Sequence, residues 1–346
     1  VPGTMQYIEA VGYTDANGRL SLPVRASQIP YDIYISRGVE YELARESGVN
    51  LSAGEIKSVQ ASLKRVVNSE GYIAADLHLH TWGSIDAPSS FDNQIRALAG
   101  EGIEFVASTD HNYIADLSPN IVSQGLQDHI KAVVGLEMTT LDGGHFNGYP
   151  LKYDPNSILH GSFYWSGRPP SEIFAELRSR AELGPDNVII QVNHPRDSAL
   201  GYFDQYGISG LTMKVGNLDS LGLGLPKGPA FVKFDEKGQV IIEDGKPVSE
   251  FSYDFNTIEV FNGKRFVQLH SMRVPENLPP ELAPLGLEPG TLLLDEGEVA
   301  FKGNVEDWFN LFNMGYRVAG LGNSDSHTPY GEEPGFPRTY VRVSDD

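Results

Sequence analysis

Apolar and polar residues alternate in several short segments near the start of the chain. The alternation is clearest over residues 31–36, and weaker versions occur over residues 20–22 and 59–63. A period of two is typical of a strand with one buried face. Asp15-Ala16-Asn17-Gly18 predicts a tight turn, because Asn-Gly tolerates the positive φ that hairpin turns require. We therefore expect residues 1–70 to form a small, partial antiparallel β unit.

From Gly71 onward the pattern changes to short apolar segments that alternate with amphipathic helical ones. This alternation is typical of βα units arranged around a parallel sheet or barrel. The predicted strands are residues 72–79, 105–109, 131–136, 188–192, 257–261 and 317–321. The predicted helices are residues 92–99, 171–183 and 305–314, with Ser171 as the expected cap of the second. Core packing is predicted for one face of the third, formed by Val305, Trp308, Phe309 and Phe312.

Two segments, residues 205–256 and 264–303, interrupt this alternation and are rich in Gly and Pro. They are too long for ordinary connections, which predicts insertions or lids. Their larger apolar residues could line an apolar pocket or pack a small local core. These residues are Leu221, Phe231, Phe234, Phe251 and Tyr253.

Composition narrows the possible functions. The 346 residues exceed the usual size of one domain, and a formal charge of −20 argues against nucleic acid or anionic membranes as partners. The absence of cysteine excludes disulfides, thiolate-bound zinc and cysteine nucleophiles. No apolar run approaches the length of a membrane span. Localisation stays open between compartments, with a periplasmic or secreted protein favoured.

Residue types that bind metals gather at the ends of the predicted strands. His78 and His80 stand two apart on a strand, so both side chains point the same way and can bind one cation. Six of the nine histidines lie in such segments, whereas chance placement would scatter them. In barrels of βα units these strand ends converge on one mouth. The segments contain His78 and His80, Asp110 and His111, Glu137 and His145, Asn193 and His194, and Asp325 and His327.

Residues close to these motifs have less specific interpretations. Asp110 is expected to orient a ligand rather than to bind metal, and Asp86 lies in a loop that could reach the site. Glu259 and Asn262 end another strand and are expected to support the rim. Arg196 could steady an anionic substrate, or it could form a surface salt bridge.

The order of these motifs resembles the PHP (polymerase and histidinol phosphatase) superfamily. Asp-Leu-His-Leu-His-Thr and Gly-Asn-Ser-Asp-Ser-His are similar to its carbaryl-hydrolase-like CehA/McbA branch, over residues 71–343. The resemblance implies an α/β fold, a distorted (β/α)7 TIM-like barrel, with a centre of two to three divalent ions (Zn, Mn or Fe). Residues 1–70 resemble a carboxypeptidase-regulatory-like β-sandwich whose first strands are missing.

The resemblance also implies which residues bind which ion. The first metal would be held by His78, His80, Glu137 and Asp325. Glu137 would bridge to a second metal bound by His145 and His194, and a third would be held by His111 and His327. Asp86 is the candidate that completes the third site, although Ser84-Ile85-Asp86 departs from the common Ser-Asp-Gly wording. Glu137, Asp325 and Arg196 are the catalytic candidates.

Three functions fit these features. The first is hydrolysis of a phosphoester by metal-activated hydroxide, and the second is hydrolysis of a carbamate, carboxyl ester or amide at the same metals. The third is a non-catalytic metal-binding module within a larger secreted protein. The first two require a small-molecule substrate as the partner. The complete set of ligand motifs favours the catalytic alternatives.

Overall fold

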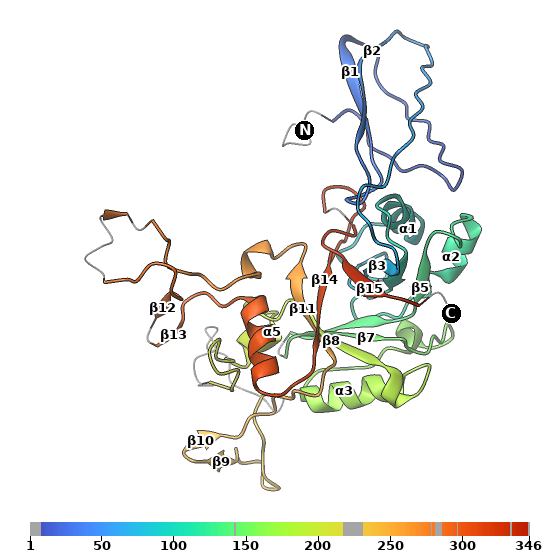
Figure 1. Ribbon diagram of the computed structural model, residues 1–346. Coiled ribbons are helices and arrows are strands. Elements are labelled where there is room, and N and C mark those ends of the chain that lie inside the picture. The colour runs from blue at the N-terminus through green and yellow to red at the C-terminus, as the bar shows by residue number, and fades with distance from the viewer. Residues whose placement is uncertain are drawn as a thin grey trace.

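The computed structural model describes residues 8–141, 143–216, 231–277, 279–280, 286–295, 297–332 and 334–344. Leu221 lies outside these residues. The described chain is a mixed α/β protein in which two central sheets carry helices on their outer faces (Figure 1). No described helix has both the length and the apolar character needed to cross a membrane.

The larger sheet has five strands in the order β14-β11-β8-β7-β6. Its β8, β11 and β14 pair in parallel, whereas β7 runs antiparallel to both β6 and β8. The sequence pattern misses β7, because this buried segment contains His, Asn and Gly instead of an apolar run. The bounds are β6 Leu136–Thr139, β7 His145–Tyr149, β8 Ile189–Val192, β11 Thr257–Asn262 and β14 Ala319–Asn323.

The smaller sheet has the order β15-β3-β4-β5, with β3, β4 and β5 in parallel and β15 antiparallel to β3. Isolated bridges between Leu79 and Ser326 and between His111 and Glu137 join the two sheets just beyond the strand ends. The described strands do not close into one hydrogen-bonded barrel, but these bridges bring their carboxyl ends together. The bounds are β3 Tyr72–Asp76, β4 Phe105–Ala107, β5 Lys131–Val133 and β15 Thr339–Arg342.

The three predicted helices are present with slightly shifted ends. They are α1 Phe91–Gly100, α3 Pro170–Ser179 and α5 Asn304–Asn313. The described chain also contains two short helices, α2 Ser118–Ser123 and α4 Tyr202–Gln205, and 3-10 turns at Ile158–Gly161, Pro185–Asn187 and Phe266–Gln268. The prediction of Ser171 as a cap is wrong, since α3 already begins at Pro170. Proline suits a first helical position, where its missing N–H would have no helical partner.

The buried face of α5 also differs from the prediction. Phe309 and Phe312 are 54% and 44% exposed, whereas Trp308 packs against the main core as predicted. The buried residues of the helix are Asn304, Asp307 and Leu311. Asp307 faces inward because it pairs with the buried guanidinium of Arg196. A charge partner within the core therefore overrides the apolar periodicity of this helix.

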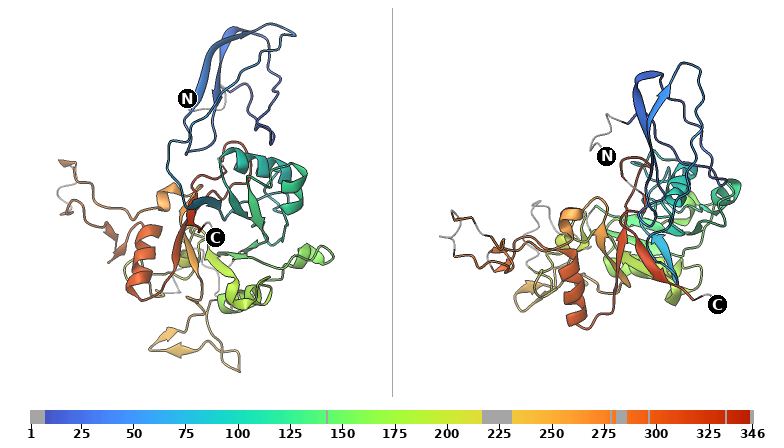
Figure 2. Two further views of the ribbon diagram at one scale, coloured as in Figure 1. Left: turned by 45° about the vertical axis from the view of Figure 1, so that its right-hand side comes forward. Right: turned by 45° about the horizontal axis from the view of Figure 1, so that its top comes forward.

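The described N-terminal part, residues 8–70, contains one hairpin, β1 Ser27–Ile35 with β2 Ala44–Leu51, which extends away from the central sheets (Figures 1 and 2). The predicted turn is present, since Gly18 N donates to Asp15 O at 2.9 Å. Strands are not formed over residues 20–22 and 59–63. The alternation in those segments leaves side chains on the surface because no second described sheet covers them.

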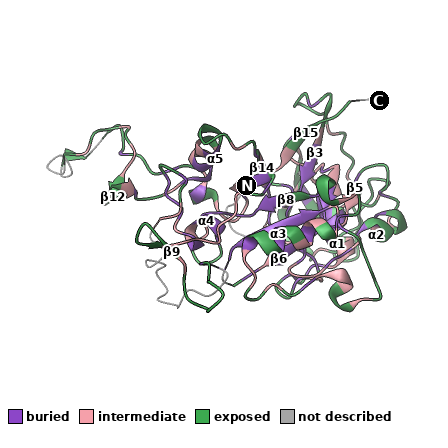
Figure 3. Ribbon diagram, turned by 90° about the horizontal axis from the view of Figure 1, so that it is seen from below, coloured by how far each residue is buried: buried purple, intermediate pink, exposed green. Residues whose placement is uncertain are grey.

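The two interrupting segments contribute short exposed hairpins that project from the body (Figures 1 and 3). Phe251 and Tyr253 belong to the main core, where the Phe251 ring stacks on Tyr202 with centroids 4.4 Å apart. Phe231 is buried in the same core, and Phe234 is exposed. Phe251 and Tyr253 also line a cavity of about 600 Å³, together with polar residues that include Lys233, Glu250 and Asp254. The hairpins are β9 Ile242–Glu243 with β10 Lys246–Pro247, and β12 Leu294–Asp295 with β13 Glu298–Val299.

Candidate metal centre

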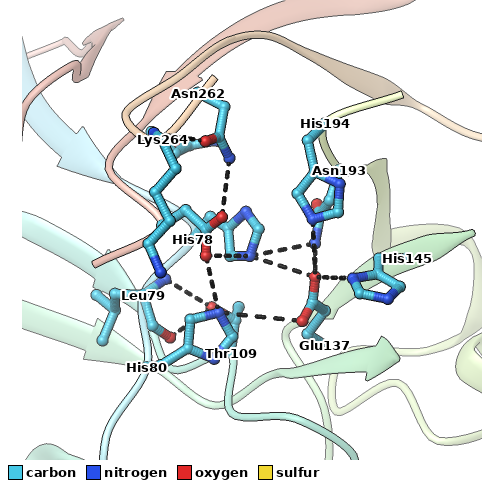
Figure 4. A network of polar contacts seen from close by, with 12 residues as sticks. His78, Leu79, His80, Thr109, Glu137, His145, Asn193, His194, Asn262 and Lys264 are labelled. Carbon is cyan, nitrogen blue, oxygen red and sulfur yellow. Dashed lines mark hydrogen bonds and ion pairs between the residues drawn. The ribbon is translucent and has the colours of Figure 1, made fainter. Parts of the chain in front are cut away.

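The predicted ligands of the first metal lie together, just beyond the ends of β3 and β14 and near the beginning of β6; Figure 4 shows His78, His80 and Glu137 of this group. His78 Nε2 is 3.3 Å from Glu137 Oε1 and 3.4 Å from Asp325 Oδ1. His80 Nε2 is 3.1 Å from the same Asp325 oxygen and 3.9 Å from Glu137 Oε2. All four side chains are buried, so two imidazoles and two carboxylates meet in one water-poor space.

Glu137 connects this group to a second one. Its Oε1 is 3.3 Å from His145 Nδ1 and 3.7 Å from His194 Nε2. The ligand atoms of Glu137, His145 and His194 lie within 4.8 Å of one another, close enough to share one ion. The arrangement suits a carboxylate that bridges two metals.

A third group lies on the other side of His80. His111 Nε2 and His327 Nε2 are each 3.4 Å from Asp86 Oδ2. The ligand atoms of His80, His111 and His327 also fall within 4.8 Å of one another. Asp86 is half exposed, which places the third group at the open edge of the centre. The structure therefore brings all nine predicted ligands together.

The donors in this space fit divalent transition metals. Imidazole nitrogens and carboxylate oxygens are the ligands that Zn, Mn and Fe take in proteins. Buried nitrogens here lack a hydrogen-bond partner among the described residues: His80 Nε2, both ring nitrogens of His145, and His194 Nδ1. Buried polar atoms are otherwise nearly always paired. The centroids of the His80 and His327 rings are 4.0 Å apart.

Hydrogen bonds to the opposite ring nitrogen assign the tautomers of three histidines. His78 Nδ1 donates to Glu259 Oε1 at 3.0 Å, and His80 Nδ1 donates to Ser84 Oγ at 3.0 Å. His111 Nδ1 lies 2.6 Å from Thr139 Oγ1, whose hydroxyl donates to Glu137. With Nδ1 protonated, each Nε2 lone pair faces the centre and is available to a metal.

Electrostatics favour different protonation states for different ligands. Burial lowers the pKa of His80 to about 3 and also lowers the pKa of His145, so both imidazoles are neutral. Burial alone would raise the pKa of Glu137, but His145, His111 and His78 outweigh it and hold that pKa well below its usual value. His78 shows the reverse balance: burial opposes its protonation, yet Asp325, Glu259 and Glu137 raise its pKa. Without metal, the surrounding carboxylates favour a proton on His78.

Glu259 contacts the metal ligands directly, whereas the sequence analysis expected it only to support the rim. It is fully buried, and its Oε2 accepts the backbone N–H of His194 at 2.8 Å while its Oε1 holds His78. Asn262 Nδ2 donates to Glu259 Oε2 at 2.9 Å and to Asp325 Oδ2 at 3.2 Å. One carboxylate therefore positions ligands from two of the three groups.

Asp110 acts through its neighbours, as an orienting residue would. Its Oδ1 accepts the backbone N–H of Thr81 at 2.6 Å and the hydroxyl of Ser84 at 2.8 Å. The same Ser84 oxygen accepts from His80 Nδ1 and, at 2.9 Å, from the backbone N–H of His111. Asp110 thus fixes Thr81 and Ser84, and Ser84 in turn holds two histidine ligands from different segments, His80 and His111.

Arg196 lies apart from these groups. Its Nε and Nη2 donate to Asp307 at 2.6 and 2.8 Å, and Nη1 donates to Ile208 O at 2.8 Å and to Asp204 at 3.2 Å. The side chain is buried, so the salt bridge is not on the surface as the alternative interpretation held. Contact with an anionic substrate stays a prediction, and every guanidinium nitrogen already has a protein partner.

Asn147 and Lys264 reach the centre without having been singled out, and Asn193, which the sequence analysis named only alongside His194, reaches it as well. Asn193 Nδ2 donates to Glu137 Oε1 at 2.7 Å and to Asn147 Oδ1 at 2.8 Å. Lys264 Nζ is 2.7 Å from His327 Nδ1. The available sequence signals were that Asn193 precedes a ligand histidine and that Lys264 follows the strand end at Asn262.

Two ligands also have unusual backbone conformations. His194 has φ 24° and Asp325 has φ 53°, a left-handed region that residues other than glycine seldom adopt. Such conformations gather at functional sites, where the surrounding structure holds them. Both residues directly follow a strand-end asparagine or serine within the buried centre. Their backbone placement is therefore part of how the ligands are aimed.

Comparisons with known proteins give only distant similarities. No family model and no curated protein matches the chain. A two-domain protein from Bacteroides vulgatus, containing a predicted PHP-like metal-dependent phosphoesterase, is similar over 82% of this chain and 63% of its own length, with 16% identity and a TM-score of 0.38. A protein proposed to be a metal-dependent phosphoesterase, from Bifidobacterium adolescentis, is similar over 79% of this chain and 92% of its own, with 12% identity and a TM-score of 0.33. The clustered ligands of this chain itself indicate a divalent metal site of the kind that metal-dependent hydrolases use.

Proposed function

We propose that the protein is a hydrolase of the PHP superfamily that cleaves a phosphoester with metal-activated water. The observation that carries the proposal is the position of Glu137, whose Oε1 faces ligands of two adjacent groups. A shared carboxylate of this kind suits a pair of ions that act on one substrate. The CehA/McbA branch and a distorted (β/α)7 TIM-like barrel remain part of this proposal.

Residues of the chain would hold the ions in three sets: His78, His80, Glu137 and Asp325; Glu137, His145 and His194; and His80 or Asp86 with His111 and His327. Divalent ions bound there would supply hydroxide at neutral pH, because a metal lowers the pKa of water from about 15.7 to around 7. Glu259 and Ser84 keep His78 and His80 oriented, and burial keeps bulk water away from the inner groups.

The charge of the centre favours an anionic substrate. Two or three divalent ions offer more positive charge than a neutral carbonyl group requires, and a transferring phosphoryl group carries charge on several oxygens. The proposed partner is therefore a small anionic molecule.

A carbamate or carboxyl-ester substrate is the second candidate, and one observation favours it. Trp82 and Ile85 lie in the loop between His80 and Asp86 and are 67% and 102% exposed. Exposed apolar side chains beside a polar centre suit an aryl or alkyl group of a substrate. A non-catalytic metal-binding module has no comparable observation in its favour, because it would not need such a complete set of oriented ligands.

Two measurements test the proposal. Plasma emission spectrometry on protein purified without chelator should find two or more Zn, Mn or Fe per chain, and a reproducible value at or below one would contradict the bridging role of Glu137. Steady-state assays on the same preparation should then compare p-nitrophenyl phosphate with 1-naphthyl acetate. Phosphate hydrolysis is expected to be the faster, whereas a hundredfold higher kcat/KM for the acetate would replace the proposed substrate class.

A further inference from the structure

Lys264 is held at the open edge of the centre by a rigid turn. Its backbone N–H donates to Asn262 Oδ1 at 2.8 Å, and the N–H of Gly263 donates to Asn323 O at 3.0 Å. A Cβ at Gly263 would lie 2.4 Å from Ser324 O, so only glycine lets this turn approach the end of β14. The turn places Lys264 beside the segment that carries Asp325 and His327.

The ammonium group of Lys264 faces two groups. Its Nζ is 2.7 Å from His327 Nδ1 and 3.7 Å from Glu332 Oε1. The first contact requires a lone pair on Nδ1, because an ammonium group only donates. His327 Nε2, however, faces Asp86 in the third ligand group.

A metal on Nε2 would change this contact. Neutral imidazole carries one proton, so ligation through Nε2 leaves that proton on Nδ1. Nδ1 would then donate to the carbonyl oxygen of Asp325, 3.0 Å away, and could no longer accept from Lys264. Among the described residues, the ammonium group would keep Glu332, at 3.7 Å, as its charged partner and would have donors available for an incoming anion.

The neighbouring cation does not share this freedom. Arg265 Nη2 donates to Asp197 at 2.8 Å, and its Nη1 donates to the carbonyl oxygen of Lys264 at 3.3 Å. The Lys264 side chain is 25% exposed and Glu332 is 30% exposed, so their ion pair adds little to stability. Lys264 is thus a pre-positioned cation at the entrance to the centre whose structural role is small.

We propose that Lys264 binds a non-bridging oxygen of the substrate's phosphoryl group and selects phosphate monoesters over diesters. This inference rests on the proposed phosphoester function. Lysine acts as a point charge toward phosphate, and a monoester presents a dianion at neutral pH whereas a diester presents a monoanion. The Lys264 ammonium group would therefore attract the monoester more strongly than the diester. It would contact the phosphoryl oxygens that carry no ester group.

The test uses the full chain loaded with metal and compares Lys264→Met with Lys264→Arg. Lys237→Met is the matched control, because it removes the same charge from an exposed turn of the 231–249 segment. Metal content is measured first, by emission spectrometry, and is expected to be equal in all four proteins. Calorimetry with inorganic phosphate gives a readout independent of turnover, and assays with p-nitrophenyl phosphate and bis(p-nitrophenyl) phosphate give KM and kcat.

Lys264→Met is expected to weaken phosphate binding and to raise KM for the monoester by about tenfold, the scale of one charge-assisted hydrogen bond. KM for the diester should change much less, Lys264→Arg should recover most of the monoester binding, and the control should match the parent protein. If the parent cleaves phosphoesters but Lys264→Met keeps the parent's phosphate affinity and KM, this inference alone is wrong. If the metal-loaded parent neither binds phosphate nor cleaves either ester, the proposed function fails and the inference with it.

Discussion

The metal centre and the N-terminal region, residues 8–70, distribute polar and apolar groups in opposite ways. At the centre Glu137 and His78 are fully buried. In the N-terminal region Ile29 and Ile56 are 77% and 92% exposed, and Val49 is the large apolar side chain there that is buried. The centre is assembled from segments up to about 250 residues apart, as in the bond between Asp76 and Ser324, whereas β1 and β2 are neighbours in sequence.

The two regions are stabilised by different interactions. Buried charges are costly unless each has a partner, so the centre depends on a complete network and on its metals. The hairpin instead depends on local turn chemistry and strand pairing, with little apolar area removed from water. Single substitutions should therefore change activity or stability strongly at the centre and only weakly in the N-terminal region. Substitutions at three positions test this expectation.

The largest effect is expected from Asp325→Asn. The change removes the charge that pairs with His78 and His80 but keeps the side-chain shape, and asparagine tolerates the left-handed backbone at φ 53°. We expect activity to fall by roughly a thousandfold, at the upper end of what loss of one electrostatic contact gives. Emission spectrometry should show fewer metals per chain, while thermal unfolding at matched metal content should change little.

Ser326→Ala, one residue away, is the control for this variant, because it alters the same loop without removing a charge. It should keep the metal content of the parent protein. If Asp325→Asn is insoluble while its activity per folded molecule is unchanged, Asp325 belongs to the scaffold and the contrast between the two regions is misplaced.

Much of the centre was predictable because strand ends carry it. His78 and His80 share a face at i and i+2, and the bridges at Leu79 and His111 bring dispersed strand ends together. What could not be predicted was the partner of each ligand. The contacts of Glu259 with His78 and of Lys264 with His327 depend on tertiary placement, and a position near a strand end does not indicate which ligand the side chain contacts.

The fold was less predictable where polar interactions override periodicity. Strand β7 lies between β6 and β8 although it lacks an apolar run, and α5 turns Asp307 inward instead of Phe309 and Phe312. In the N-terminal region the alternation over residues 20–22 and 59–63 predicted strands that do not form. Alternation indicates a strand only where a partner and a covering layer are present, and both are tertiary features.

The second largest effect is expected from Arg196→Met. This variant tests whether the buried charge of Arg196 contributes to catalysis or to the stability of the scaffold. The variant leaves Asp307 buried without its partner, which is expected to lower the free energy of unfolding by about 3 kcal/mol. Metal content and activity per folded molecule should stay those of the parent. Arg178→Met breaks a more exposed pair with Asp254 and should cost about 1 kcal/mol or less in urea unfolding. A large loss of kcat in folded Arg196→Met would instead support the predicted role in substrate binding.

The smallest effect is expected at the contact between the two regions. The Tyr13 hydroxyl donates to Pro329 O at 2.8 Å, and its ring stacks on Tyr330 with centroids 5.7 Å apart, three residues after the ligand His327. Tyr13→Phe removes the hydrogen bond but keeps the ring, so urea unfolding should show a loss of about 1 kcal/mol.

Tyr164→Phe is the control for this variant. It removes the same hydroxyl from a 73% exposed residue and should cost less than about 0.5 kcal/mol. Metal content should be equal in both variants, because His327 is held by Asp325 and its neighbours rather than by Tyr13. A loss of one metal equivalent in Tyr13→Phe alone would show that the N-terminal region helps to form the third ligand group, and the contrast between a self-contained centre and a separate N-terminal region would no longer hold.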